Sequence, residues 1–226
     1  LVAHYAASVN SQFTGADDFI QAYQDESADF HQLVADMAGI PRTQAKTINL
    51  GLFYGMGKAK LSRELGIDKD RAEKLLNQYN NRVPFVKSLA TEVTSSASKY
   101  GFIRTVKGRK CRFDMWEPTT FGMNKAMNYE EAKAIYGNNI RRAFTYKALN
   151  RLIQGSAADQ TKQAMIDCYK AGMMPLLQIH DELCFSVNDE NDIKLITQKM
   201  ENAIEHLKVP FTVDIALGRS WGEAKE

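Results

Sequence analysis

The spacing of apolar residues predicts a chain built mainly of helices, with a few strands grouped toward its end. Apolar side chains recur at the helical period in the segments 16–24, 29–39, 42–55, 68–82, 86–99 and 192–207. A further helical run extends from about 128 to 169, with a break expected near Gly155, and Gly39 marks one helix end. Strand patterns occur at 101–106, 110–113, 176–187 and 211–217. Helices placed before and between late strands indicate an α+β fold and not a βαβ repeat.

The segment 176–187, LLQIHDELCFSV, carries ionisable residues inside an apolar strand pattern. Its apolar side chains at odd positions share one face of an extended chain, and Asp181 has the same parity. A straight strand would bury the Asp181 carboxylate, which costs several kcal/mol or shifts its pKa. A tight turn at His180 and Asp181 removes the conflict, because it holds the polar groups at the tip of two paired strands. Such a hairpin would aim acids at a cation; the alternative is a solvated polar turn.

The net charge of +2 conceals an uneven distribution along the chain. Residues 1–41 contain six acids and no Lys or Arg, whereas residues 42–151 contain 22 bases and nine acids. The densest basic stretch has five bases from Arg104 to Arg112, in a pattern that suits a hairpin around Gly108. Such patches often bind phosphate backbones, and the alternative is a solvated basic surface.

Composition excludes several classes of protein. The chain has 44% hydrophobic and 25% charged residues, as in ordinary globular proteins, and no apolar run approaches the ~20 residues of a membrane span. Three scattered cysteines, Cys111, Cys168 and Cys184, indicate neither a zinc site nor a disulfide framework. The first residues lack the pattern of a signal peptide, so we expect a cytoplasmic setting. Because the chain opens on Leu1, directly in a helix-like segment, we expect it to be a piece of a longer protein.

The segment 42–55, RTQAKTINLGLFYG, places two cations and an aromatic ring on one helix face. Arg42, Lys46, Leu50 and Tyr54 stand at successive i, i+4 positions. Cations one helical turn apart can reach neighbouring phosphates of one triphosphate, and the side chains beyond them can support a base or ribose. A lone R-x-x-x-K pair is usually solvated, so this interpretation depends on the remaining motifs.

Several ordered motifs resemble family A DNA polymerases, the DNA polymerase I type of bacteria and many phages. The segment 42–55 is similar to the family pattern R-x-x-x-K-x-x-x-(F/Y)-G-x-x-Y-G, and residues 180–182 match its H-D-E hairpin. Residues 101–113, GFIRTVKGRKCRF, resemble its G-x-x-x-T-x-x-G-R-(R/K) hairpin, and residues 150–159, NRLIQGSAAD, its N-x-x-x-Q-G-x-A-A-D pattern. The segments LVAHYA and DFH also match in order, so the resemblance spans nearly the whole chain.

The resemblance implies a nucleotide site on the helical part of the chain. His31, Arg42 and Lys46 would hold the triphosphate of an incoming dNTP, and Lys46 would also protonate the departing pyrophosphate. Leu50 occupies the position that contacts the sugar, and Tyr54 would stack near the templating base.

The resemblance also implies metal and DNA contacts. Asp181 would ligate Mg²⁺ in a two-metal site that activates the primer 3′-hydroxyl, with Glu182 as a weaker ligand; both count as catalytic residues together with Lys46. The primer-template DNA would be contacted at its minor groove, whose acceptors are nearly independent of the base, and along its backbone. The residues implied in these contacts are Asn150, Gln154, His180, Arg104 and Arg109.

Two departures from the family pattern affect the expected activity. Leu50 stands where the family usually has Phe or Tyr, as is reminiscent of phage polymerases, and this predicts altered discrimination between sugars. The family's first motif, D-Y-S-x-I-E-L-R, would lie just before LVAHYA, and its aspartate bridges both metals. Because this chain lacks that carboxylate, we expect it not to extend primers alone and to need the missing N-terminal part of the polymerase, on the same or a separate chain.

The implied architecture is a palm-helix remnant at 1–11, a helical fingers subdomain at 12–115 and a palm portion with an antiparallel sheet at 116–226, with strands at 175–187 and 211–217. The implied function is template-directed DNA synthesis in a bacterial or phage-infected cytoplasm. Two alternatives stay open. A non-catalytic nucleic-acid-binding module would bind in a salt-dependent way without a response to Mg²⁺ or nucleotide, and a piece of a single-subunit RNA polymerase would prefer ribonucleotides.

Overall fold

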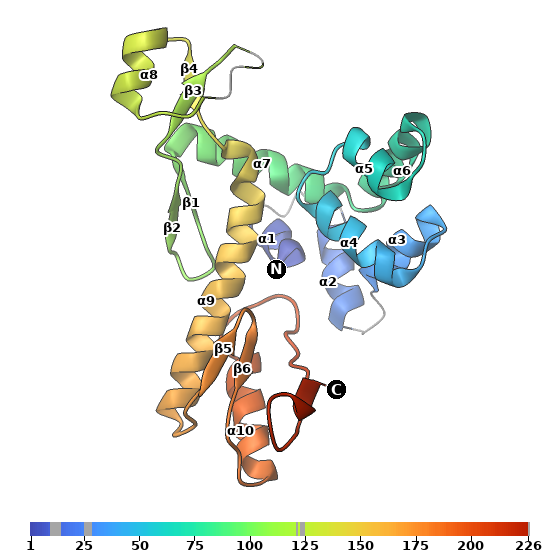
Figure 1. The fold of residues 1–226 in the computed structure, drawn as a ribbon, viewed down its shortest axis with the longest axis vertical. Coiled ribbons are helices and arrows are strands. Elements are labelled where there is room, and N and C mark those ends of the chain that lie inside the picture. The colour runs from blue at the N-terminus through green and yellow to red at the C-terminus, as the bar shows by residue number, and fades with distance from the viewer. Residues whose placement is uncertain (10–14, 25–28, 121, 123–124, 226) are drawn as a thin grey trace.

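The computed structural model describes residues 1–9, 15–24, 29–120, 122 and 125–225. Figure 1 shows an elongated molecule in which the long helix α9 (Ala148–Lys170) runs from a mainly helical half to a smaller half. The smaller half contains the hairpin of β5 (Leu177–Ile179) and β6 (Glu182–Cys184), with α10 (Glu190–Glu201) beside it. Within the described part of the chain, no helix is long and apolar enough to cross a membrane.

The helical half contains the helices predicted between residues 16 and 99 at nearly their predicted bounds, and a further helix at Lys58–Leu65 that was not predicted. Local signals set their ends: the Asp29 side chain caps α3 by accepting two backbone N–H groups, and Gly39 ends it in a left-handed conformation, φ 65°. Pro84, which has no N–H to leave unpaired, opens α7. The helices are α1 (Val2–Val9), α2 (Ala16–Gln24), α3 (Phe30–Ala38), α4 (Arg42–Phe53), α5 (Lys58–Leu65), α6 (Lys69–Arg82) and α7 (Pro84–Tyr100).

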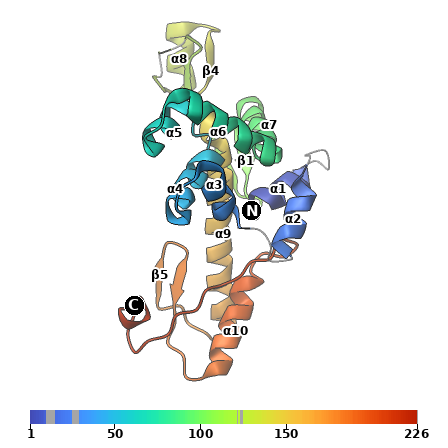
Figure 2. The ribbon, with the colours of Figure 1, turned by 90° about the vertical axis from the view of Figure 1, so that its right-hand side faces the viewer.

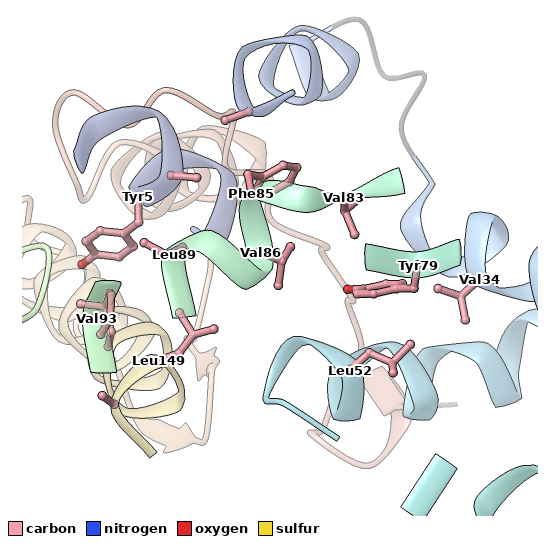
Figure 3. Packing of buried hydrophobic residues seen from close by; sticks show 14 of the residues in the cluster. Tyr5, Val34, Leu52, Tyr79, Val83, Phe85, Val86, Leu89, Val93 and Leu149 are labelled. Carbon is pink, nitrogen blue, oxygen red and sulfur yellow. The ribbon is translucent and has the colours of Figure 1, made fainter. Parts of the chain in front are cut away.

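The core of the helical half is built around α7, which contacts α1, α6 and α9. Its buried side chains recur at helical spacing and form one stripe, which consists of Phe85, Val86, Leu89, Val93 and Ala97. Figure 3 shows this stripe meeting Tyr5 of α1 and Leu149 of α9 on one side, while Tyr79 of α6 packs near Val34 and Leu52 on the other. Burying each large apolar side chain contributes about 1.5–3 kcal/mol, so this junction fixes α6, α7 and α9 together.

Among the described residues, strands occur in three separate antiparallel pairs, which together with the helices confirm the α+β class. β1 (Phe102–Arg104) pairs with β2 (Lys110–Arg112), and Gly108 at φ 78° lies in their turn, as predicted. β3 (Trp116–Pro118) pairs with β4 (Ile140–Arg142), and α8 (Tyr129–Tyr136) packs against both. The short 3-10 helix η1 (Thr145–Lys147) leads into α9.

Two predictions about these elements are wrong. The expected break near Gly155 does not exist, because α9 continues through it; the interruption lies at 137–147, where Gly137 ends α8 and β4 pairs with β3. The expected strand at 211–217 is not formed either. Its Val213 N–H is bonded to the Glu201 carboxylate, no strand in the described part of the chain pairs with it, and Ile215 and Leu217 are exposed.

Candidate nucleotide and nucleic-acid site

Helix α4 separates an apolar face from a cationic one. Ala45, Ile48 and Leu52 are buried against the core. Arg42 and Lys46 are exposed on the other side with Leu50, which is 47% exposed. The predicted stripe therefore lies on the solvent side of the helix, and it ends at Tyr54, the half-buried residue that follows the last helical turn.

Arg42 forms an ion pair with the residue that caps α3. Its Nε donates a 2.7 Å hydrogen bond to Asp29 Oδ2, while Asp29 Oδ1 accepts the backbone N–H of His31 and of Gln32. The hydrogen bond from Arg42, followed by that from the Gln32 backbone, lowers the pKa of the Asp29 carboxyl. Both side chains are about half exposed, so the pair adds little stability, but it joins the starts of α3 and α4.

His31 lies between this cationic face and the core. Its Nδ1 is 3.2 Å from Asn49 Nδ2, and the Asn49 side chain is fully buried. Burial lowers the pKa of His31; the nearby Arg42 and Lys46 charges lower it further, and only Asp29 raises it. His31, Arg42 and Lys46, which the resemblance groups together, thus share one region of α3 and α4.

The end of α4 contacts α9 through two predicted site residues. Gln154 Nε2 donates a 2.8 Å hydrogen bond to the Tyr54 hydroxyl. Gln154 is exposed, and Asn150 stands one helical turn before it on α9, half-buried. The structure therefore brings a predicted nucleotide residue and a predicted DNA residue into contact.

The β5–β6 hairpin has the predicted turn. Ile179 pairs with Glu182, so His180 and Asp181 form a two-residue loop, and His180 has a positive φ of 55°. Positive φ is the conformation that tight hairpin turns require, and the Gln178 side chain donates to the His180 carbonyl to brace it. Asp181 is exposed at the tip. Figures 1 and 2 show the turn end of this hairpin on the same side of α9 as α4, pointing toward the helical half.

The carboxylates of the hairpin differ in their surroundings. Glu182 Oε1 accepts a 2.8 Å hydrogen bond from the indole N–H of Trp221, whereas Asp181 is exposed to solvent. The described residues contain no group of three or more His, Cys, Asp or Glu side chains that could enclose a metal ion. Exposed carboxylate at Asp181 nevertheless fits Mg²⁺, which commonly uses one or two protein carboxylates and completes its shell with water and phosphate.

The basic hairpin β1–β2 lies on α9 through Arg109. Its Nε is 2.7 Å from Asp159 Oδ1 and its Nη2 donates to the Gly155 carbonyl, so two of its five N–H groups are bonded to α9. Arg104 is exposed, with one donor on the Gly108 carbonyl. Of the two predicted DNA-contacting arginines, Arg109 therefore has a structural role that the sequence did not indicate.

A buried hydroxyl fixes the same hairpin. Ser156 Oγ donates to the Leu152 carbonyl and accepts the Val106 N–H at 3.1 Å. Since its own proton is used, the Tyr5 hydroxyl, 2.5 Å away, donates to Ser156. Tyr5 thereby ties α1 to α9 and to the basic turn.

Sequence reasoning missed the residues that support the site from behind. None of Asp29, Asn49, Tyr79, Asp159 and Trp221 was singled out, although each contacts a predicted site residue or its neighbour in the core. Asn49 carried a usable signal, because an amide on the apolar face of 42–55 needs a buried partner.

Comparison with known proteins gives consistent results. A DNA-directed DNA polymerase of Pseudomonas phage M6 is 36% identical over 234 residues, which cover 88% of this chain and 32% of the relative. DNA polymerase I of Lactococcus lactis subsp. lactis is 32% identical over 236 residues, covering 96% of this chain and 25% of the relative. The chain thus spans about a third or less of the curated relatives it matches.

A solved structure resembles the whole fold. The POL domain of Pol1 from M. smegmatis, in complex with DNA primer-template and dNTP, has a TM-score of 0.73 and 28% identity, and the match covers 100% of this chain and 39% of that one. The family model for DNA polymerase family A matches residues 8–223. With nearly its whole length matched in this way, the chain belongs to DNA polymerase family A.

Proposed function

We propose that this chain is the part of a DNA polymerase that binds the incoming dNTP and the primer end during template-directed DNA synthesis. The observation that carries the proposal is the arrangement of α4 and the β5–β6 hairpin. Helix α4 and the turn end of the hairpin lie on one side of α9 (Figures 1 and 2), and Arg42, Lys46 and Asp181 on them are exposed. A triphosphate on α4 would meet a metal-binding carboxylate across that side.

In this proposal the residues of the chain divide the work. Arg42 and Lys46 neutralise phosphate charge, and Lys46 supplies a proton to pyrophosphate as it leaves. Mg²⁺, when bound, would lower the pKa of the primer 3′-hydroxyl and stabilise the leaving group. Asp181 would hold it, with Glu182 close by and oriented by Trp221. Tyr54 would face the templating base, and Leu50 the sugar.

DNA contacts belong to the second part of the proposal. Asn150, Gln154 and His180 would meet the minor groove, and Arg104 the backbone, while Arg109 would act mainly by holding the hairpin on α9. We keep the division into a palm helix at 1–11, fingers at 12–115 and a palm portion at 116–226 as part of this proposal. For primer extension the chain would need an upstream part of the polymerase, which would supply the other essential carboxylate.

Nucleotide binding by the purified chain tests the proposal. We expect dATP with Mg²⁺ to raise its thermal unfolding midpoint, and Lys46→Met to abolish most of that shift because a phosphate contact is lost. Lys60→Met, at an exposed lysine of α5, is the matched control and should keep it. No shift with any dNTP would contradict the proposal.

The same assay separates the alternatives. A larger shift with ATP than with dATP would favour a piece of an RNA polymerase. DNA binding that is indifferent to Mg²⁺ and nucleotide would favour a non-catalytic module. Primer extension by the chain alone would refute the expected need for the upstream part.

A further inference from the structure

Asn49 is a fully buried polar residue on the core-facing side of α4. Its Nδ2 lies 3.2 Å from His31 Nδ1 on α3, and its Oδ1 lies 3.4 Å from the hydroxyl of Tyr79 on α6. Tyr79 is 2% exposed, and Figure 3 shows its ring near Val34 of α3 and Leu52 of α4. One amide thus links three helices at the place where His31 enters the site.

The chemistry of the amide restricts His31. In the observed orientation the Tyr79 hydroxyl donates to the Asn49 carbonyl oxygen, so the amide NH₂ faces the imidazole. An NH₂ group can only donate, so His31 Nδ1 must be an unprotonated acceptor. A protonated Nδ1 would set two donors against each other in a buried position, which is costly. The ring then carries its proton on Nε2, across the ring from this contact.

The charges around His31 act in the same direction. Arg42 and Lys46, both on α4, disfavour a second cation, and burial does so most strongly, whereas Asp29 alone favours it. The result is a pKa of His31 below its ordinary value of 6.5. The hydrogen bond and the surrounding charges thus favour the same neutral ring.

We propose that Asn49, held by Tyr79, is a positioning residue that keeps His31 neutral with its proton on Nε2, so that the ring offers one fixed N–H donor to a nucleotide phosphate. The phosphate contact rests on the proposed function, whereas the tautomer does not. Arg42 and Lys46 would neutralise the charge of the phosphates, and the His31 Nε2–H would donate a hydrogen bond in one fixed orientation.

Nitrogen-15 NMR of the histidine rings tests the tautomer directly. The four histidines of the chain are assigned by single His→Gln substitutions, and His31 should show an unprotonated Nδ1 and a protonated Nε2 at pH 7. Asn49→Asp replaces the donor by a carboxylate, which should draw a proton to Nδ1 and raise the titration midpoint of His31 by about 1–2 pH units. A protonated Nδ1 in the unsubstituted chain would overturn the inference.

Tyr79→Phe isolates the role of the second residue. This substitution removes the donor that faces the Asn49 carbonyl oxygen, so we expect His31 to show a mixture of both tautomers and the affinity for dATP with Mg²⁺ to fall about 3- to 10-fold. Tyr100→Phe, at a hydroxyl on α7 whose residue is 58% exposed, is the control and should change neither. Circular dichroism shows whether each variant is folded.

The two proposals fail in different ways. If the chain binds no dNTP but His31 keeps the Nε2–H form, only the nucleotide assignment is wrong. If dNTP binds while Tyr79→Phe leaves both the tautomer and the affinity unchanged, the positioning role is wrong. A His31 that stays purely Nε2–H in Asn49→Asp, with the fold intact, also contradicts it.

Discussion

Gln154 Nε2 donates a 2.8 Å hydrogen bond to the hydroxyl of Tyr54, joining α9 to the end of α4 across 100 positions of sequence. Both residues belong to the proposed site, one on the side of the DNA and one on the side of the nucleotide. The bond leaves the Tyr54 hydroxyl proton and the Gln154 carbonyl oxygen available for contacts with a ligand. The contact ties the end of α4 to α9.

Removing the Tyr54 hydroxyl should break the hydrogen bond between α4 and α9 and lower the stability slightly. We expect Tyr54→Phe to lower the free energy of unfolding by about 0.5–1.5 kcal/mol, the net value of one hydrogen bond, as measured by urea denaturation. Gln154→Ala should add little in the double variant, because the two changes remove the same bond. Tyr146→Phe, at a residue 71% exposed, serves as the control. Additive losses would show that the bond does not form in solution.

The ion pair of Asp29 with Arg42 competes with phosphate for the guanidinium. Asp29→Asn retains a side-chain oxygen for the α3 cap but removes the charge, so we expect tighter dNTP binding, by about 2- to 5-fold, in calorimetry. Because the pKa of Asp29 is lowered in the fold, the stability it contributes is present above the ordinary value of 3.8 and is lost as the pH falls through the folded pKa. The difference between the two proteins should vanish in acid. Weaker binding by Asp29→Asn would show that the ion pair preorganises Arg42.

Two histidines should make the fold sensitive to mild acid. Burial lowers the pKa of His4 and of His31, so both favour the neutral form when folded. The stability they contribute is complete above the ordinary value of 6.5 and is lost as the pH falls through their folded pKa values. The thermal midpoint should drop between pH 7.5 and 5, and His4→Gln with His31→Gln should flatten that decline. An unchanged slope would assign the decline to other groups.

Arg109 and Arg104 should respond differently to substitution. Arg109→Met leaves the Asp159 carboxylate, which is 6% exposed, without its cation, and we expect a loss of roughly 1–3 kcal/mol, since Arg109 itself is half exposed. Arg104→Met should cost less than about 0.5 kcal/mol and reduce only DNA binding. Urea denaturation and filter binding to a primer-template distinguish the two. Equal stability losses would contradict the structural role of Arg109.

We expect Gly155 to be needed because β1–β2 packs closely against α9 there, and not because the helix must bend. An ideal Cβ there would lie 2.9 Å from Thr105 Cγ2, so Gly155→Ala should destabilise by about 1–2 kcal/mol even though alanine favours helices. Thr105→Ser removes that methyl group and keeps the hydroxyl that accepts the Arg109 N–H. The double variant should recover most of the loss in thermal unfolding. If it does not, the clash lies elsewhere.

The sequence predicts those features that depend on local chemistry. The helix end at Gly39 and the turn at His180 and Asp181 follow from short patterns, and the structure confirms both. Gly155 was misread because its effect is tertiary: the hairpin of β1 and β2 approaches α9 there, and the helix does not break.

The rest of the candidate site could not be predicted from local patterns. The pairing of Asn49 with His31 and of Trp221 with Glu182 depends on which helices and loops meet. The spacing of residues along the chain does not indicate these two contacts. For segment 211–217 the opposite holds: the alternation of apolar and polar residues predicts a strand, but no strand in the described part of the chain pairs with it.

Helix α9 is continuous and therefore acts as a rigid spacer between the α4 region and the β5–β6 hairpin. Its first turns carry Asn150 and Gln154 beside α4, and the hairpin with Asp181 follows only a few residues after its end. One residue inserted after Asp159 would advance everything beyond it by about 1.5 Å and rotate it by about 100° around the helix axis. In the proposed site the carboxylate tip would then turn away from α4, so we expect the length of this segment to matter as much as the identity of the side chains it carries.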